Sequence, residues 1–204
     1  MSFRSSLVAV AFFALMQAGC ADISVMKKDA VYDPNENAVV VIVGQAFKSG
    51  CTPGVSAWSG IRDEAFPDFS FFLANTVGCL EKGGHVGYSV LKVAPSQFVL
   101  NFFDGEQSKY LRNRCRTIYT DDGISFSAPP FKERKAPKFA ALKGEVVYVG
   151  DIIYEAPCNP KVIGVVRNDK AAQAALADYP NFKADMVYRP LIINNREVNA
   201  PKVE

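Results

Sequence analysis

The sequence predicts a mainly β fold, which is an immunoglobulin-like or similar antiparallel sandwich or open barrel with one short C-terminal helix. Three observations lead to this prediction. Short apolar stretches recur along the chain, signals for turns that are rich in Gly, Pro and Asp separate them, and one capped, Ala-rich helical segment follows late in the chain. The alternative is a mixed α+β domain in which residues 48–80 contain additional helix.

Strands are expected in chain order at residues 38–47, 69–73, 86–94, 97–103, 114–120, 124–127, 144–154 and 161–167, with a further strand within 182–193. Residues 38–47 (AVVVIVGQAF) form a β-branched run that is typical of a strand buried on both faces. Residues 86–103 alternate on both sides of Pro95 and predict a hairpin. Asp-Gly at 122–123 predicts a second hairpin.

The remaining segments are expected to be a loop and a helix. Residues 48–68 are rich in Gly, Pro, Ser and Asp and predict a long loop. A helix is expected over residues 170–178, with Asn168 or Asp169 as its N-cap and Pro180 beyond its end. It is expected to cover one edge or end of the sandwich.

Aromatic residues are dense around the expected loop, at Trp58, Phe66, Phe69, Phe71 and Phe72. Such a group forms either a ligand surface or a small core beneath the loop. The sequence favours the small core.

The first residues have the pattern of a secretory signal peptide. Arg4 supplies a positive charge, residues 7–16 (LVAVAFFALM) form an apolar run, and small residues follow. The run is shorter than the roughly 20 residues that a membrane-spanning helix needs. The expected organisation is a signal peptide at 1–19, a flexible lipid-anchored tether at 20–37 and a single β-rich domain at 38–204.

Ala18-Gly19-Cys20 resembles the lipobox of bacterial lipoproteins. The resemblance implies a diacylglyceryl group on the Cys20 thiol, cleavage before Cys20, and acylation of the new N-terminus by a fatty acid such as palmitate. Gln17 departs from the pattern, which has Leu there. Ala21 implies sorting to the outer membrane. The alternative is ordinary cleavage that leaves a soluble periplasmic protein.

The chain has five cysteines, Cys20, Cys51, Cys79, Cys115 and Cys158. An odd number in an exported protein leaves one thiol without a partner, and lipidation of Cys20 accounts for it. The other four can form two disulfides in an oxidising compartment. Three connectivities are open, and the preferred one pairs Cys51 with Cys79 and Cys115 with Cys158, because the first disulfide would close the expected loop.

The charge balance excludes a polyanion binder that acts through its overall field. Without Arg4 of the signal peptide, the 23 basic residues become 22 against 21 acidic ones, so nucleic acid is not an expected partner. Arg112, Arg114 and Arg116 would share one face of a strand and could bind an anionic envelope component. The competing interpretation, a solvated face balanced by nearby acids, is favoured. A second basic cluster comprises Lys132, Arg134, Lys135 and Lys138.

No recognisable catalytic or cofactor motif occurs in the chain. His85 is its one histidine and follows a Gly-Gly turn, so a surface position is expected. Asp121-Asp122-Gly123 lacks the ligand spacing of a calcium loop and fits a turn instead. We therefore expect no cofactor and no metal.

Gly144-x-x-x-Tyr148-x-Gly150, followed by a strand and a helix, resembles poorly characterised bacterial envelope lipoproteins with a small β-sandwich. The resemblance implies a fold and a location. The expected function is non-catalytic binding or a structural role at the membrane or cell surface, with the lipid in the membrane and an anionic component or a protein as partner. The alternative is a periplasmic hydrolase that acts on cell-wall or lipid material.

Overall fold

The fold is taken from a computed structural model of the chain. It describes residues 26–50, 54–61, 70–75, 78–106, 114–118, 131–133, 135–156 and 159–203. For Lys82, 102–106, 114–118, Phe131 and Asn159 only the backbone is described.

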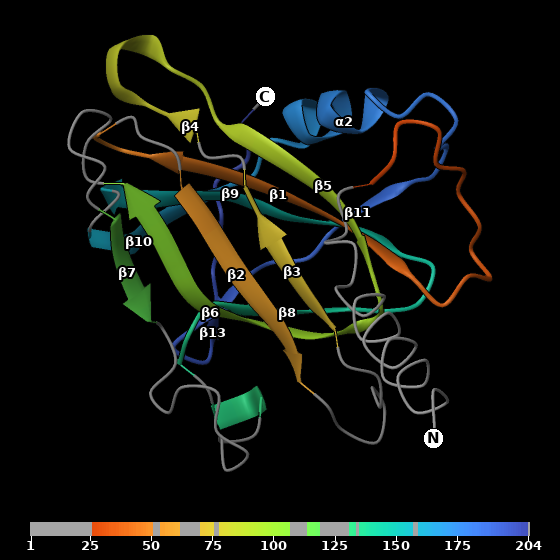
Figure 1. The fold of residues 1–204 in the computed structure, drawn as a ribbon, viewed down its shortest axis with the longest axis horizontal. Coiled ribbons are helices and arrows are strands. Elements are labelled where there is room, and N and C mark those ends of the chain that lie inside the picture. The colour runs from red at the N-terminus through yellow and green to blue at the C-terminus, as the bar shows by residue number, and fades with distance from the viewer. Residues whose placement is uncertain are drawn as a thin grey trace, which may run out of the picture.

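The described strands form two sheets that face each other (Figure 1). Sheet A contains β1 (Val39–Phe47), β4 (Gly78–Cys79), β5 (Gly87–Val93), β9 (Val146–Ala156), β10 (Asn159–Val166) and β11 (Met186–Tyr188). Sheet B contains β2 (Gly54–Ile61), β3 (Phe71–Ala74), β6 (Ser96–Glu106), β7 (Arg114–Ile118), β8 (Lys138–Ala141), β12 (Ile192–Ile193) and β13 (Arg196–Glu197). Short 3-10 turns lie at Glu81–Gly83 and Phe131–Glu133.

The prediction of a mainly β, sandwich-like fold with one short helix is confirmed. Sheet A differs from the expected antiparallel arrangement, because β1 pairs in parallel with β9 and with β4, and β9 pairs in parallel with β11. Parallel neighbours require connections that leave the sheet and return. Between β1 and β9 the chain makes this connection by building most of sheet B.

The main core lies between the two sheets. β1 is buried along its whole length, as expected for residues 38–47. Trp58 of β2 is fully buried, stacks on Phe72 at 5.9 Å between ring centroids, and meets Phe139 edge-on at 5.5 Å. The long loop expected over residues 48–68 is therefore wrong for 54–61. Trp58 and Phe72 belong to the main core, whereas Phe66 and Phe69 lie outside the described residues.

The hairpin expected over residues 86–103 is also wrong. β5 pairs with β1 in sheet A, whereas β6 pairs with β2, β7 and β8 in sheet B. The turn at Pro95 therefore carries the chain from one sheet to the other. Each strand buries its apolar face in the same core, which is why alternation alone resembled a hairpin.

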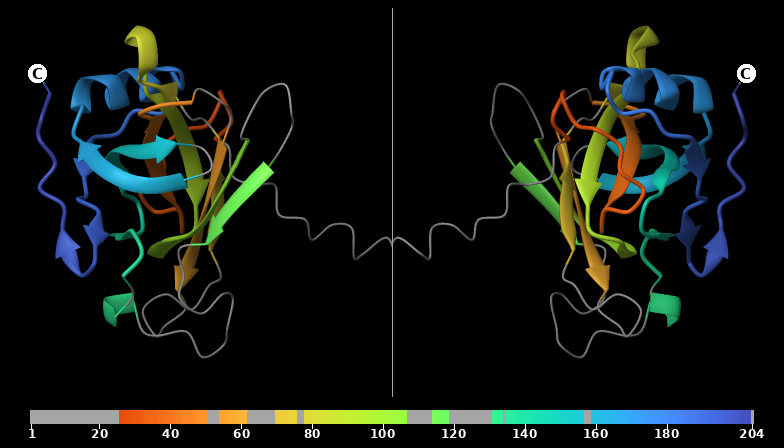
Figure 2. Two further views of the ribbon diagram at one scale, coloured as in Figure 1. Left: turned by 90° about the vertical axis from the view of Figure 1, so that its left-hand side faces the viewer. Right: turned by 90° about the vertical axis from the view of Figure 1, so that its right-hand side faces the viewer.

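The helix α2 (Asp169–Ala177) packs on the outer face of sheet A, opposite sheet B (Figure 2). Asn168 is its N-cap, and its Oδ1 accepts a hydrogen bond from the Ala171 N–H at 3.0 Å. We expected the helix to cover an edge or an end of the sandwich. It covers a face instead, where Ala172 and Leu176 are buried.

The N-terminal segment also packs on this outer face. Met26 is 4% exposed, lies in the cluster beneath α2, and donates its N–H to the Val90 carbonyl at 3.2 Å. Tyr32 packs edge-on against Phe182 at 5.3 Å. Residues 20–37 were expected to form a flexible tether, but within 26–37 both Met26 and Tyr32 pack against the domain. In the described part of the chain no helix has the length and apolarity that crossing a bilayer requires.

Candidate functional site

The first candidate site is built by an irregularity in β9. Ile42 of β1 faces Tyr148 of β9, yet Gly44 faces Asp151, so β9 has one extra residue in this interval. Gly150 lies within it at φ +96°, a conformation that favours glycine. In a regular strand, residues three apart point to opposite faces. The bulge brings both Tyr148 and Asp151 to the face beneath α2.

Two tyrosines donate hydrogen bonds to the Asp151 carboxyl. The Tyr148 hydroxyl donates to Oδ1 at 2.7 Å, and the Tyr88 hydroxyl donates to Oδ2 at 2.9 Å. The Tyr148 oxygen in turn accepts the Asn168 N–H at 3.0 Å. We call Tyr88, Tyr148 and Asp151 the Asp151 cluster. It links β5, β9 and the start of α2 through one carboxyl.

Asp151 is 2% exposed, so its carboxyl lies in a water-poor environment. Gly44 leaves the space for it, because a Cβ at Gly44 would come within 2.0 Å of Asp151 Oδ1. Among the described residues no Lys or Arg forms an ion pair with Asp151. Hydrogen bonds from neutral hydroxyls are therefore its main compensation for lost hydration.

Burial raises the pKa of the Asp151 carboxyl above its ordinary value, while the hydrogen bonds from Tyr148 and Tyr88 oppose this rise. Burial, together with the nearby Asp151 charge, raises the pKa of both tyrosines far above the ordinary value. Both hydroxyls therefore keep their protons at any physiological pH and remain donors. Asp151 is the titratable member of the cluster.

The second candidate site is an open groove of about 700 Å³ beside the end of α2. It is lined by Tyr32, Gly144, Glu145, Val146, Gln173, Phe182, Lys183, Ala184, Asp185 and Val187. Val146 and Phe182 are buried at its base, whereas Lys183 and Asp185 are exposed at its rim. The groove thus combines an apolar base with charges of both signs.

The walls of the groove are fixed by hydrogen bonds. The Tyr32 hydroxyl donates to the Gly144 carbonyl at 2.8 Å, and Glu145 accepts the Leu142 N–H at 2.9 Å. Glu145 also pairs with Arg189. These contacts join the N-terminal segment, the turn before β9 and the segment after β11, so the groove has a defined shape.

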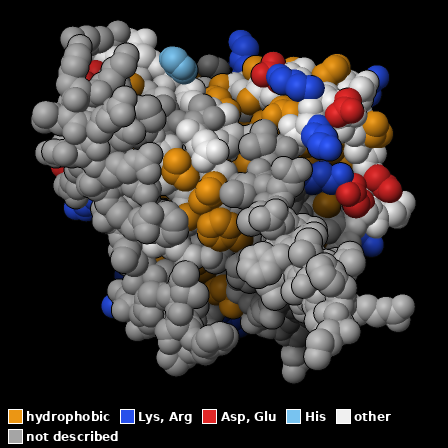
Figure 3. All heavy atoms as spheres, viewed as in Figure 1, with side chains coloured by type: hydrophobic (Ala, Val, Ile, Leu, Met, Phe, Trp, Pro, Cys, Tyr) orange, Lys and Arg blue, Asp and Glu red, His pale blue; other side chains and the backbone are white. Residues whose placement is uncertain are grey.

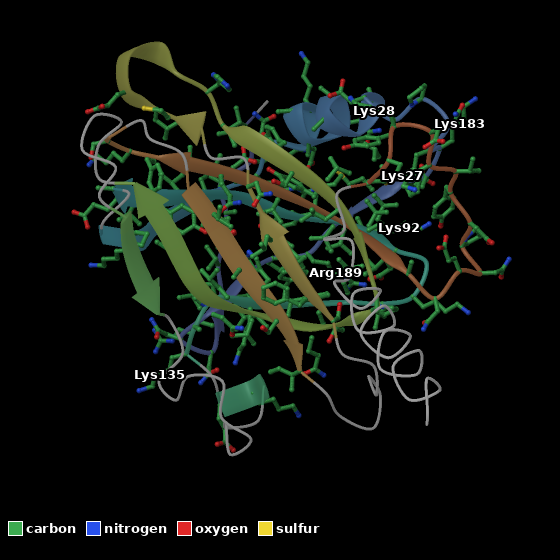
Figure 4. The ribbon with its side chains drawn as sticks, viewed as in Figure 1. Lys27, Lys28, Lys92, Lys135, Lys183 and Arg189 are labelled. Atoms are coloured by element: carbon green, nitrogen blue, oxygen red, sulfur yellow. The ribbon has the colours of Figure 1, made fainter. Side chains whose placement is uncertain are left out.

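Basic and acidic side chains are intermingled around the groove and α2 (Figure 3). Lys92 pairs with Glu36, and Lys28 pairs with Asp178 at 3.5 Å. Figure 4 shows Lys27, Lys28, Lys92 and Lys183 on this side of the molecule. Mixed signs favour a partner with both charges over a polyanion.

The cysteine predictions are largely outside the described residues. Cys79 is disulfide-bonded and lies in β4. Cys20, Cys51 and Cys158 fall outside the described residues, and Cys115 is described only as backbone. The pairing of Cys51 with Cys79 and of Cys115 with Cys158 stays a prediction, as does lipidation of Cys20.

The predicted arginine face falls on strand β7, which pairs with β6 in sheet B. Strand β7 contains Arg114 and Arg116, and Arg112 falls outside the described residues. The backbone register places Asp104 opposite Arg116 and Glu106 opposite Arg114. Facing positions of opposite charge stabilise a sheet. The side chains at these positions lie outside what the structure describes, so the balanced face and the anion site both stay predictions.

The structure also shows the surroundings of Lys138 and His85. Lys138 is 2% exposed, and its Nζ donates to the Lys132 carbonyl at 3.1 Å and to Asn195 Oδ1 at 2.6 Å. It therefore does not belong to a surface patch with Lys132 and Lys135. His85 is exposed after its Gly-Gly turn, as expected. Within the described ranges no group of His, Cys, Asp or Glu side chains could hold a metal ion.

Sequence reasoning missed the Asp151 cluster and the groove. The motif Gly144-x-x-x-Tyr148-x-Gly150 pointed to the right strand, but it gave no role to its tyrosine. Asp151 follows directly after this motif, and a polar residue inside a buried strand was the available signal. Comparison with protein family models, curated proteins and solved structures finds no match to this chain.

Proposed function

We propose that this chain is a lipid-anchored envelope protein that binds a partner through the groove beside α2. The lipobox-like residues before Cys20 support the anchor. The groove, with its fixed walls and its mixed apolar and charged lining, is the observation that supports binding. The role is non-catalytic in this proposal.

The position of Met26 adds a geometric argument. Six residues lead from Cys20 to Met26, and an extended chain covers at most about 3.5 Å per residue, so the buried Met26 lies within roughly 20 Å of the lipidated residue. Tyr32, which forms one wall of the groove, follows six residues later. A lipid on Cys20 would therefore keep the groove close to the membrane surface.

Lipidation is tested in cells that express the full chain. Cys20→Ser should lose all label from a radioactive fatty acid and should leave the membrane fraction. Gln17→Leu is the matched control, because it restores the residue that the lipobox pattern has there, and it should keep the label. Equal labelling of the Cys20→Ser variant and the unaltered chain would reject the anchor.

Binding through the groove is tested by photo-crosslinking in the same cells. A benzophenone amino acid replaces Lys183 at the groove rim or, as a control, the exposed Lys135, which lies at the far end of the molecule (Figure 4). Adducts specific to position 183 are expected. The same adducts at both positions, or none at position 183, would contradict a binding role for the groove.

A further inference from the structure

The Asp151 cluster gives the domain a feature that its proposed role in binding does not require. A carboxyl is buried with two hydroxyl donors and no paired cation among the described residues. An apolar pair or an amide would fill the same space without an ionisable group. Ionisation of a buried carboxyl is costly, so its charge state affects whatever covers it.

Helix α2 is coupled to this carboxyl through Tyr148. The Tyr148 oxygen accepts the Asn168 N–H at the N-cap, and Tyr148 donates to Asp151. The helix is nine residues long and buries only Ala172 and Leu176. Elements with few buried contacts open locally at a lower free-energy cost than the core of a domain.

Of the residues that the structure describes, those packed directly against Asp151 carry no positive charge. Gly44 of β1 has no side chain, and β5 and β9 contribute the neutral hydroxyls of Tyr88 and Tyr148. The start of α2 contributes the Asn168 N–H to Tyr148. An ionised Asp151 thus depends on these neutral donors alone within the described surroundings.

Arg167, the cation that directly follows β10, is engaged elsewhere. The Val166 carbonyl of β10 lies 3.5 Å from the Tyr148 hydroxyl. The next residue, Arg167, donates to Asp169 at 2.8 Å and stacks over the Tyr188 ring at 4.5 Å. Its guanidinium therefore neutralises Asp169 at the first turn of α2 and does not form an ion pair with the buried carboxyl.

The site can also accommodate the protonated carboxyl. Tyr148 already accepts from Asn168, so it keeps its role as a donor to Asp151 Oδ1. Tyr88 is only half-buried, so it can turn its own O–H towards water and accept from a protonated Oδ2. Proton uptake from solvent thus reverses one hydrogen bond and leaves no polar group unpaired.

We propose that Asp151 is a proton-operated latch, in which a proton on the carboxyl holds α2 closed on sheet A and loss of that proton loosens the helix. The raised pKa of Asp151 gives the direction of the pH dependence. A carboxyl whose pKa is higher in the folded state stabilises folding below its ordinary value of 3.8, and this contribution is lost as pH rises through the folded-state pKa.

The latch also reaches the groove, because Gln173 of α2 lines it. Loosening of the helix moves this side chain relative to Phe182 and Val146, which belong to the base of the groove. The groove is therefore expected to be better formed below the folded-state pKa of Asp151 than above it. This expectation does not depend on lipidation of Cys20.

The test is hydrogen exchange on the processed full chain, measured at several pH values and corrected for the intrinsic dependence of exchange on pH. Protection of the α2 amides should fall as pH rises, up to tenfold for each unit by which folding raises the Asp151 pKa. Asp151→Asn should remove this dependence. The control Asp185→Asn alters an exposed groove aspartate and should keep it.

A second variant keeps the proposal testable if Asp151→Asn does not fold. Tyr88→Phe removes a hydrogen bond that lowers the Asp151 pKa, so the loss of α2 protection should move to higher pH. The titration of Asp151 itself is followed through the NMR shift of its carboxyl carbon. A midpoint at or below 3.8, or the same pH dependence in Asp151→Asn and the unaltered chain, would overturn the latch.

Discussion

Replacement of Tyr148 by Phe removes one hydroxyl and breaks two buried hydrogen bonds. The hydroxyl donates to Asp151 Oδ1 at 2.7 Å and accepts the Asn168 N–H at 3.0 Å. A hydrogen bond to a charged group contributes about 1.5–3 kcal/mol and a neutral one about 0.5–1.5 kcal/mol. Together they predict that the free energy of unfolding falls by roughly 2–4 kcal/mol.

The assay is equilibrium unfolding in urea at neutral pH, followed by tyrosine and tryptophan fluorescence. Tyr88→Phe is the comparison, since it breaks only the bond to Asp151 Oδ2 from a half-buried position and should cost less. The two changes should not be additive, because both act on one carboxyl. A Tyr148→Phe domain within about 0.5 kcal/mol of the unaltered chain, the usual range for surface changes, would refute this reasoning.

Three further outcomes are expected. Gly44→Ala should cost about 1–3 kcal/mol of unfolding free energy, because its Cβ would meet Asp151 Oδ1. The control Gly164→Ala has open space around its Cβ and should stay within about 0.5 kcal/mol, so equal effects of the two changes would contradict the close approach. Trp58→Ala should lower the free energy of unfolding by about 3–5 kcal/mol in the same urea assay, and a change near zero would contradict burial of Trp58 in the core. Non-reducing peptide mapping should join Cys79 to Cys51, and any other partner would reject that connectivity.

The elements with strong local signals were predicted from sequence. The β-branched run at 38–47 could only be a buried strand, and β9 and β10 showed the same kind of run. The helix was marked at both ends by its cap and by Pro180. In each case short-range residue patterns and long-range packing favour the same structure.

Two features of the sandwich had no such signal. Most residues of β2 are Gly, Ser or Ala, which are not strong strand formers, and burial of Trp58 in the main core outweighs that preference. The alternating residues of β5 and β6 correctly predicted two strands, but alternation does not indicate which sheet a strand joins. A turn at Pro95 fits a hairpin and a crossing between sheets equally well.

The Asp151 cluster could not be predicted from sequence for a different reason. A strict two-residue period puts Tyr148 and Asp151 on opposite faces, so their contact depends on the bulge near Gly150. Tyr88 comes from β5, 63 residues away from Asp151 in sequence. The cluster therefore follows from a local irregularity combined with a long-range pairing, and neither is visible in a single segment.

We propose that a lipid on Cys20 holds this domain at a membrane. The most direct test of this proposal is mass spectrometry of the N-terminal peptide of the mature protein, purified from membranes with detergent. We expect a peptide that begins at Cys20 and carries a thioether-linked diacylglyceryl group and an N-terminal fatty acid. A mature chain that begins elsewhere, or that begins at Cys20 with a free thiol, would contradict it.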